Sequence, residues 1–312
     1  MTKDTIGVDI SKGTLVAYRS STGEHRQFLN GPAGCSAFIA WAREDEVDRV
    51  VFEPTGPYHR TFERALGKAN VPISKINPRH ARRFAEATGS LAKTDRVDAA
   101  MLARMGMLLE SDIRPIISET LDKLRDLSLA RQALIKDRTA AKNRQKVLRV
   151  LLLQKQNTQR LGQIESQLKA IHTAIETLVR SNEDLKSRAN ILVSIPGIST
   201  LTAHTLLIDM PELGTLDARQ VASLAGLAPV TRESGTWKGR SFIRGGRARL
   251  RQALYMPALA ACRFNPDYKI KYAQMKAAGK PSKVAITAVM RKLIVLANAL
   301  IRDRRYWTPK MT

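Results

Sequence analysis

The sequence predicts three parts: an α/β N-terminal domain, a central pair of long helices and a mostly helical C-terminal domain. Three observations support this division. Residues 1–117 alternate short apolar strands with helical segments, residues 118–189 contain almost no glycine or proline, and residues 190–312 hold helical segments separated by loops. At 312 residues, the chain is long enough for two domains that each bury their own core.

The N-terminal part begins with three short strands at hairpin spacing. Apolar and polar residues alternate in each of them, which predicts an antiparallel meander. The strands are followed by alternating helices and strands. The predicted strands are residues 5–11, 13–20, 24–30, 49–55 and 71–77, and the predicted helices are residues 36–44, 58–70, 79–89 and 95–107. The order βββαβαβα with one further helix is the pattern of the ribonuclease H-like fold, which we therefore predict for residues 1–117.

The central part carries an apolar seam. Six apolar residues recur at intervals of three and four: Leu161, Ile164, Leu168, Ile171, Ile175 and Leu178. Such heptad spacing predicts a helix that packs along a partner helix. The segment before it fits the same register, although Arg131, Arg138 and Gln145 interrupt it. Residues 118–189 therefore predict two long helices, either as a coiled-coil hairpin or as a dimerisation arm.

The C-terminal part contains a helix, a tight turn and a second helix within residues 191–210. This arrangement is similar to a helix-hairpin-helix, whose turn amides hold a phosphate at a helix N-terminus. Such hairpins usually have a second glycine where this chain has Ser199, so a plain helical turn remains the alternative. Residues 282–305 predict an amphipathic basic helix that packs on the core.

The net charge of +24 favours a polyanionic partner, most simply nucleic acid. The competing partner is an anionic membrane, which is disfavoured because we find no 18-residue apolar run and no N-terminal signal pattern. The net charge is +3 in residues 1–117, +7 in residues 118–189 and +14 in residues 190–312. The last part is therefore the predicted main phosphate-binding surface. The basic stretch from 131 to 160 is either a solvated helix face or an arm along a nucleic-acid backbone.

The two cysteines, Cys35 and Cys262, lie far apart in the sequence. They form neither a disulfide framework nor a zinc-binding spacing. We therefore expect free thiols in a reducing cytosol, which predicts a cytoplasmic protein that acts at the nucleoid.

Four acids of the N-terminal part indicate a metal site. Asp9 lies within the first strand, where burial of a carboxylate is costly unless it is paired or binds metal. Glu53 ends a second strand, and Asp95 and Asp98 share one face of a helix. Clustered carboxylates suit Mg²⁺ or Mn²⁺, and two such ions can assist phosphoryl transfer. Taken singly, Asp95 could instead cap its helix and Asp98 could pair with a neighbouring arginine.

The second candidate site is residues 235–251, where Ser241 lies among basic residues. Six of them surround it: Lys238, Arg240, Arg244, Arg247, Arg249 and Arg251. This stretch is either a surface that holds a polyanion or a site where the serine reacts with one. A serine hydroxyl needs activation, here from a metal ion rather than from one of the five scattered histidines. The arginines could hold the scissile phosphate. Ser234 is a second hydroxyl, better explained as a loop or capping group.

Six motifs together resemble the DEDD-type insertion-sequence transposases. They are GVDISK at 7–12, EPTGPY at 53–58, AKTDRVDA at 92–99, IPGIS at 195–199, LAGLAPV at 224–230 and SGTWKGRSFIRGGRARLR at 234–251. The resemblance covers nearly the whole chain, with Ser199 as the one departure. It implies an N-terminal RuvC-like domain joined through a coiled coil to a C-terminal transposase domain.

The resemblance also implies a mechanism. Studied members are RNA-guided recombinases, in which a bridge RNA pairs with both target and donor DNA. Metal held by the acidic tetrad of one subunit acts near the serine of another, and by family position that serine is Ser241. The serine forms a covalent phosphoserine link to DNA, and strand exchange passes through a Holliday junction. The family assembles as homodimers and homotetramers.

Two other functions remain open from the residues alone. One is a metal-dependent junction nuclease in which the four acids do all the chemistry. The other is a non-catalytic nucleic-acid-binding protein that uses only its basic surface. Replacement of Ser241 distinguishes the junction nuclease from a serine recombinase, because only the recombinase needs the serine. Replacement of the acids distinguishes the non-catalytic binding protein from both enzymes, because only the enzymes need the acids for cleavage.

Overall fold

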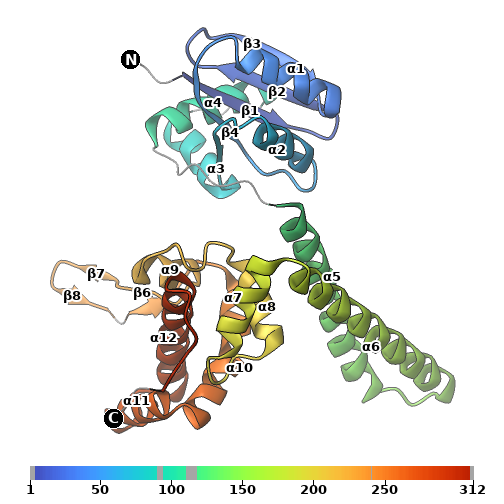
Figure 1. The fold of residues 1–312 in the computed structure, drawn as a ribbon, viewed down its shortest axis with the longest axis vertical. Coiled ribbons are helices and arrows are strands. Elements are labelled where there is room, and N and C mark those ends of the chain that lie inside the picture. The colour runs from blue at the N-terminus through green and yellow to red at the C-terminus, as the bar shows by residue number, and fades with distance from the viewer. Residues whose placement is uncertain (1–3, 90–93, 110–117, 240, 310–312) are drawn as a thin grey trace. The chain divides into compact units, whose positions relative to one another are not determined.

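The computed structural model describes residues 4–89, 94–109, 118–239 and 241–309 (Figure 1). The chain divides into two compact units, Met1–Ser118 and Glu119–Thr312. The first is a mixed α/β unit and the second is mostly helical, as the sequence predicts. The long helices of the central part belong to the second unit, so they share it with the C-terminal helices.

A five-stranded mixed sheet forms the centre of the first unit. Its strands are β1 (Asp4–Ile10), β2 (Thr14–Arg19), β3 (His25–Leu29), β4 (Val47–Phe52) and β5 (Ile73–Lys75). Their order is β3-β2-β1-β4-β5. β2 is antiparallel to both β1 and β3, whereas β4 is parallel to both β1 and β5. This sheet is consistent with the predicted ribonuclease H-like fold.

Helices cover both faces of this sheet (Figure 1). α1 (Pro32–Ala42) and α2 (His59–Lys68) pack on one face, where Phe38 and Phe62 join an apolar core with Ile6 and Val8 of β1. α3 (Pro78–Ala87) and α4 (Asp95–Leu108) pack on the other face, around Val51 of β4. Side chains alternate along a strand, so Gly7 and Asp9, which flank the core residue Val8, lie on the face of β1 toward α4.

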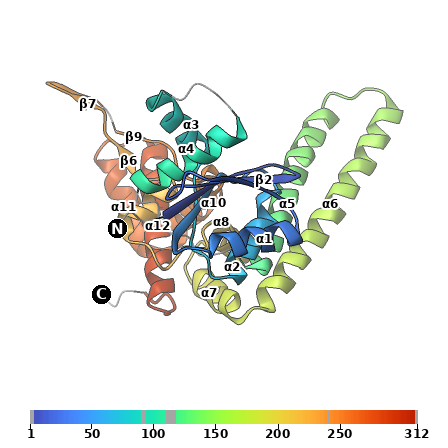
Figure 2. The same cartoon turned by 90° about the horizontal axis from the view of Figure 1, so that it is seen from above.

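The central part is a pair of long helices, α5 (Glu119–Gln145) and α6 (Leu151–Arg180), which lie side by side in Figures 1 and 2. The seam residues Ile164, Leu168 and Ile175 of α6 are buried. The three residues that interrupt the seam in α5 all hydrogen-bond across to α6: Arg131 to His172, Arg138 to Glu165 and Gln145 to Asn157. These cross-links fix the register of the pair. Coiled-coil geometry and a role in dimerisation stay predictions.

The C-terminal helices enclose one large apolar core. They are α7 (Glu183–Val193), α8 (Thr200–Asp209), α9 (Ala218–Leu224), α10 (Ala248–Phe264), α11 (Pro266–Ala277) and α12 (Ser282–Arg302). No 18-residue apolar run was expected in this chain, and α12 differs from that expectation. This helix has such a window, with a mean hydropathy of 1.9, but 56% of the window is buried within the protein. Its length and apolarity are accounted for by its place in the core, where Val289, Leu293 and Leu300 are fully buried.

The turn between α7 and α8 packs on a neighbouring helix. Gly197 has a φ of +101°, and a side chain there would come within 2.7 Å of the Pro257 carbonyl oxygen in α10. The Ser199 hydroxyl caps α8 by accepting a hydrogen bond from the Thr202 amide at 3.3 Å. A glycine is therefore needed here for helix packing, and a phosphate-binding helix-hairpin-helix stays a prediction.

Candidate active site

Asp9 and Glu53 lie at the same edge of the sheet. β1 and β4 are parallel, and Val8 is the register partner of Phe52. Asp9 follows Val8, and Glu53 follows Phe52, so the two acids are placed next to each other at the carboxyl ends of neighbouring strands. The Asp9 side chain is on the face of β1 that α4 covers. The topology of the sheet thus brings together two acids that are 44 positions apart in the sequence.

The helix α4 contributes the other two acids from its first turn. Thr94 is its N-cap and accepts a hydrogen bond from the Val97 amide at 3.3 Å, so the capping role considered for Asp95 belongs to Thr94. α4 packs directly on β1 because Gly7 has no side chain, whereas a methyl group at that position would overlap the carbonyl oxygen of Ala99. This close packing carries Asp95 and Asp98 to the edge of the sheet where Asp9 lies.

The electrostatics of Asp9 show that the four acids are neighbours. Burial is the largest cause that raises the pKa of Asp9 from 3.8 to about 6, and the charges of Asp95, Asp98 and Glu53 contribute to the same rise. Within the described residues, no three Asp, Glu, His or Cys side chains are close enough together to hold a metal ion as they stand. The acids form a repulsive cluster that a divalent cation would relieve, and hard oxygen ligands suit Mg²⁺ or Mn²⁺.

Ser241 lies in the second unit, on a nested pair of short β-hairpins. The inner pair is β7 (Glu233–Ser234) with β8 (Trp237–Lys238), and the outer pair is β6 (Pro229–Val230) with β9 (Phe242–Ile243). The inner hairpin projects beyond the helices of this unit (Figures 1 and 2). Ser241 immediately precedes β9 and is exposed, as is Ser234 on β7. Both hydroxyls are therefore accessible, and exposure alone does not choose between them.

The hairpin joins α10 through two adjacent glycines, of which Gly246 is tightly packed. Gly245 and Gly246 have φ values of +72° and +61°. A side chain on Gly246 would collide with the backbone of Gly226 and the carbonyl oxygen of Ser223. The Arg247 amide then donates to the Leu224 carbonyl at 2.7 Å. The C-terminal end of the hairpin is thus packed against the segment 223–226.

Three of the six basic residues around Ser241 are engaged within the protein. Arg247 makes a two-pronged ion pair with Glu212, with N–O distances of 2.7 and 2.8 Å. Arg249 pairs with the buried Asp209 at 3.2 Å and donates to the Ser128 hydroxyl at 2.6 Å. Arg251 donates to the carbonyl oxygens of Gly245 and Gly226. These partners fix the base of the hairpin, which differs from the expectation that all six side chains face a polyanion.

Of the remaining three, Arg244 is exposed, and no ion pair in the described part of the chain involves it. Arg240 and the side chain of Lys238 lie outside the described residues. Nucleic-acid contact by any of the six stays a prediction. The roles of Asp209 and Glu212 were not predicted from the sequence. Acids are rare in residues 190–312, and this rarity is the signal that could have marked both as partners of an arginine.

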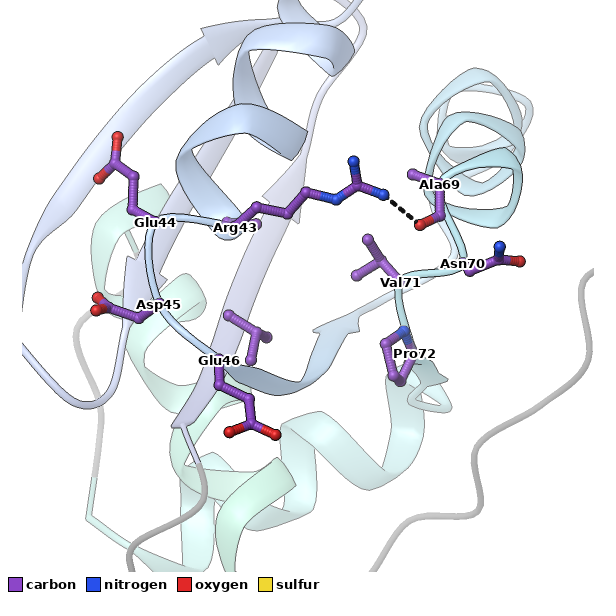
Figure 3. A pocket seen from close by; sticks show the side chains of 10 residues that line it. Arg43, Glu44, Asp45, Glu46, Ala69, Asn70, Val71 and Pro72 are labelled. Carbon is purple, nitrogen blue, oxygen red and sulfur yellow. Dashed lines mark hydrogen bonds between the residues drawn. The ribbon is translucent and has the colours of Figure 1, made fainter.

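A shallow pocket of about 450 Å³ lies elsewhere in the first unit (Figure 3). It is lined by the segments 42–47 and 69–72, which precede β4 and β5, and Arg43 closes it with a 2.7 Å hydrogen bond to the Ala69 carbonyl. Because β1, β4 and β5 are parallel, this pocket is at the opposite end of the sheet from Asp9. None of the predicted site residues lines it.

Comparison with known sequences identifies the family. The transposase model DEDD_Tnp_IS110 matches residues 6–156, which include all four acids, and the model of the transposase IS116/IS110/IS902 family matches residues 189–273, which include Ser241. The chain belongs to the DEDD-type insertion-sequence transposases. This transposase is therefore a DNA-recombining enzyme, which bears out the family predicted from the motifs.

Relatives of this transposase include two that match over their full lengths. The pilin gene-inverting proteins of Moraxella bovis and Moraxella lacunata are each 29% identical over 98% of this chain and 98% of their own. A 43.6 kDa protein of insertion element IS110 from Streptomyces coelicolor is 31% identical over 47% of this chain and 38% of its own length.

Proposed function

We propose that this transposase cuts DNA with Ser241 as a covalent nucleophile, assisted by divalent metal held by Asp9, Glu53, Asp95 and Asp98. The observation that carries the metal site is the placement of Asp9 and Glu53 at one edge of the sheet, where burial and the charges of the other three acids raise the pKa of Asp9 to about 6. Carboxylates gathered in one place are typical of sites that bind cations or do acid–base chemistry.

The donor set supports Mg²⁺ or Mn²⁺ as the cofactor. All four side chains offer hard carboxylate oxygens, and the thiol and imidazole ligands that zinc prefers do not belong to the set. A bound divalent ion would neutralise the negative charge of a phosphodiester and lower the pKa of a coordinated hydroxyl group. The acids themselves hold the ion and keep the cut strand at the edge of the sheet.

The covalent step balances without an additional reactant. The Ser241 Oγ forms a bond to phosphorus, and the bond between phosphorus and the 3′ oxygen of the neighbouring nucleotide breaks. The serine loses its proton, and the 3′ oxygen gains one, so the products are a phosphoserine link and a free 3′-hydroxyl. Attack of a 3′-hydroxyl from another strand on the phosphoserine reverses the same chemistry and joins the exchanged strands. In this proposal the exposed Arg244, three residues after Ser241, contacts the phosphate on the Ser241 side.

Guidance by RNA and an assembly of several subunits complete the proposal. They are supported by the resemblance to bridge-RNA-guided recombinases and by the net charge of +24, which suits simultaneous contact with RNA and DNA. In such an assembly, the acids of one subunit act beside the serine of another, and exchange passes through a Holliday junction. The reaction belongs in the cytosol, where the chromosomal DNA lies.

The full-length match to the pilin gene-inverting proteins favours a second outcome of the same chemistry. Recombination between two sites in opposite orientation inverts the segment between them. We therefore propose that this transposase also inverts DNA when its two sites face each other. A plasmid that carries the sites in opposite orientation tests this, since inversion there and excision from directly repeated sites are distinguishable by the lengths of amplified products.

Replacement of single hydroxyls tests the nucleophile. Ser241→Ala is expected to abolish the covalent protein–DNA adduct and strand exchange, whereas Ser234→Ala keeps both, because only Ser241 is proposed to react. The two exposed serines lie on the same hairpin, so each variant controls for the other. The adduct is measured by its retarded migration on a denaturing gel after incubation with labelled DNA, guide RNA and Mg²⁺.

Two results would contradict the proposal. Normal recombination by Ser241→Ala would exclude the serine mechanism and favour a nuclease that relies on its four acids, because such an enzyme needs no serine. Retained cleavage in both Asp9→Asn and Asp98→Asn would remove the metal site from the mechanism.

A further inference from the structure

A second pocket adjoins the acids on the face of the sheet that α4 covers. α4 packs on β1, β2 and β4, and a pocket of about 630 Å³ lies beside its first turn. The pocket is lined by two groups of residues: Val16, His25, Arg26 and Gln27 from β2 and β3, and Thr94, Asp95 and Arg96 from α4. Its volume is within the range of about 300–1,000 Å³ that is typical of small-molecule sites. Asp95 thus belongs both to the acidic cluster and to this pocket.

The strand register forms a continuous row from the acids into the pocket. Asp9 pairs with Val16, and Val16 pairs with Gln27. Directly opposed residues in antiparallel strands point to the same face of a sheet, so all three side chains face the α4 side. Val16 is almost fully buried and forms an apolar floor, whereas Gln27 is exposed at the outer edge of the sheet. A molecule held over the acids can therefore continue across Val16 to Gln27.

The polar groups of the pocket are available for a ligand. Arg96 is exposed, and none of the ion pairs found among the described residues includes it. The His25 Nδ1 is buried and lacks a hydrogen-bond partner in the described part of the chain. Burial and the nearby Arg96 lower the pKa of His25, so its ring is neutral at physiological pH. Arg26 is occupied elsewhere, since it pairs with Glu24 at 3.0 Å and lies over Trp41.

We propose that this pocket binds the nucleotide that adjoins the scissile phosphate in the cut DNA strand. Arg96 holds its phosphate, Val16 contacts its sugar, and Gln27 and His25 bond to its polar edge. The inference rests on the proposed function, since it takes the acids to be the place where DNA is cut. It adds a positioning site on the first unit, separate from the basic residues around Ser241.

Charge and chemistry favour a nucleic-acid strand over other ligands. Beside Asp95 at its rim and the already paired Arg26, the pocket offers the cationic Arg96, the polar side chains of His25, Gln27 and Thr94, and an apolar floor at Val16. These groups match a phosphate, a base or sugar edge and a sugar face. DNA rather than RNA is chosen because Asp95, at the rim, is part of the metal site proposed for DNA cleavage. An RNA strand in the same place is an outcome that the test below can reveal.

Photocrosslinking in the full-length protein tests the site. Gln27→p-benzoylphenylalanine is irradiated with a labelled single-stranded DNA 20-mer of mixed sequence, and Glu46→p-benzoylphenylalanine serves as the control. Glu46 lines the pocket at the opposite end of the same sheet (Figure 3). We expect the crosslink from position 27 to exceed that from position 46 about tenfold, as a phosphate contact worth about 1.4 kcal/mol would give. Adding Arg96→Ala should lower the crosslink from position 27 to the control level.

A matched arginine variant and a matched RNA complete the test. Arg82→Ala changes an exposed arginine of α3 outside the pocket and should leave the crosslink from position 27 unchanged. Equal crosslinking from positions 27 and 46, equal effects of Arg96→Ala and Arg82→Ala, or stronger crosslinking to an RNA 20-mer of the same sequence would each overturn the inference. The Ser241 adduct, measured in parallel on the unsubstituted protein, separates the two claims. An adduct without the expected crosslink refutes this inference alone, whereas the expected crosslink without an adduct refutes the serine mechanism.

Discussion

At the scale of single residues, the raised pKa of Asp9 supports a cation site. A carboxyl group near the end of a buried apolar strand is costly to bury, and here three further acids increase the cost. The pKa of Asp9 is higher in the folded protein than in the unfolded chain, so this group favours folding when it is protonated. The stability that it contributes is lost as the pH rises through about 6, and at neutral pH its ionised form opposes folding.

The replacement Asp9→Asn is therefore expected to have two opposite effects on stability. At pH 7.5 and without metal, it should raise the melting temperature by a few degrees, because a neutral amide removes the repulsion from three carboxylates. It should also eliminate the further stabilisation that wild-type protein gains from Mg²⁺. Thermal melts with EDTA and with Mg²⁺ measure both effects, with Glu46→Gln as a control at the far end of the sheet. A lower melting temperature without metal, or an intact response to Mg²⁺, would contradict the account.

The clustering of the four acids could be predicted from the sequence, whereas the internal ion pairs of Arg247 and Arg249 could not. Asp9 stands out because it interrupts an apolar strand, and this signal is local. Arg247 and Arg249 look like phosphate contacts in a basic stretch, but their partners Glu212 and Asp209 precede them by 35 and 40 positions. Local composition cannot reveal these two ion pairs, because only the packing of α8 and the segment after it against the start of α10 brings the side chains together.

At the scale of elements, periodicity predicted the two long helices, and tertiary contacts explain their irregularities. Arg131, Arg138 and Gln145 break the apolar seam of α5, which by pattern alone weakens the case for a helix pair. Each of them hydrogen-bonds to a residue of α6. Polar pairs of this kind fix register at some cost in stability. The short strands β6 to β9 escaped prediction because two-residue strands have no measurable period.

The hairpin that carries Ser241 offers a second stability prediction. Gly246 and Gly235 both have positive φ values, but only Gly246 is packed against backbone, whereas nothing lies within 4 Å of a side chain placed on Gly235. Gly235→Ala should cost about 1 kcal/mol from the strained backbone alone. Gly246→Ala should cost about 1–3 kcal/mol more, because the methyl group must displace the Gly226 backbone. Urea unfolding curves measure the difference, and equal costs would show that the base of the hairpin is not rigid.

At the scale of the whole molecule, charge and the proposed catalytic groups are divided between the two units. The acids belong to the first unit, and residues 1–117 carry a net charge of only +3. Residues 118–189 and 190–312 carry +7 and +14 and belong almost wholly to the second unit, which also has its own large core. The proposed metal site therefore belongs to one unit, and the proposed serine nucleophile and most of the positive charge belong to the other.

This division predicts how a fragment behaves. Residues 119–312 should fold cooperatively alone, because their apolar core lies within the second unit. The fragment should also keep most of the dependence of DNA affinity on salt concentration, since that slope reflects the number of neutralised phosphates. Circular dichroism during thermal unfolding and DNA titrations at several salt concentrations measure the two properties. A fragment that is unfolded, or one that binds DNA with a much smaller salt slope than the full chain, would contradict the division.

The central claim is that Ser241 becomes covalently joined to DNA, and mass spectrometry of the trapped adduct tests it most directly. Wild-type protein is incubated with DNA, guide RNA and Mg²⁺, denatured, and digested with protease and nuclease. The account predicts a peptide that contains Ser241 and carries a nucleotide remnant through a phosphate on the hydroxyl, and predicts its absence in Asp9→Asn. A remnant on Ser234 or on another residue, or efficient recombination without any modified peptide, would contradict it.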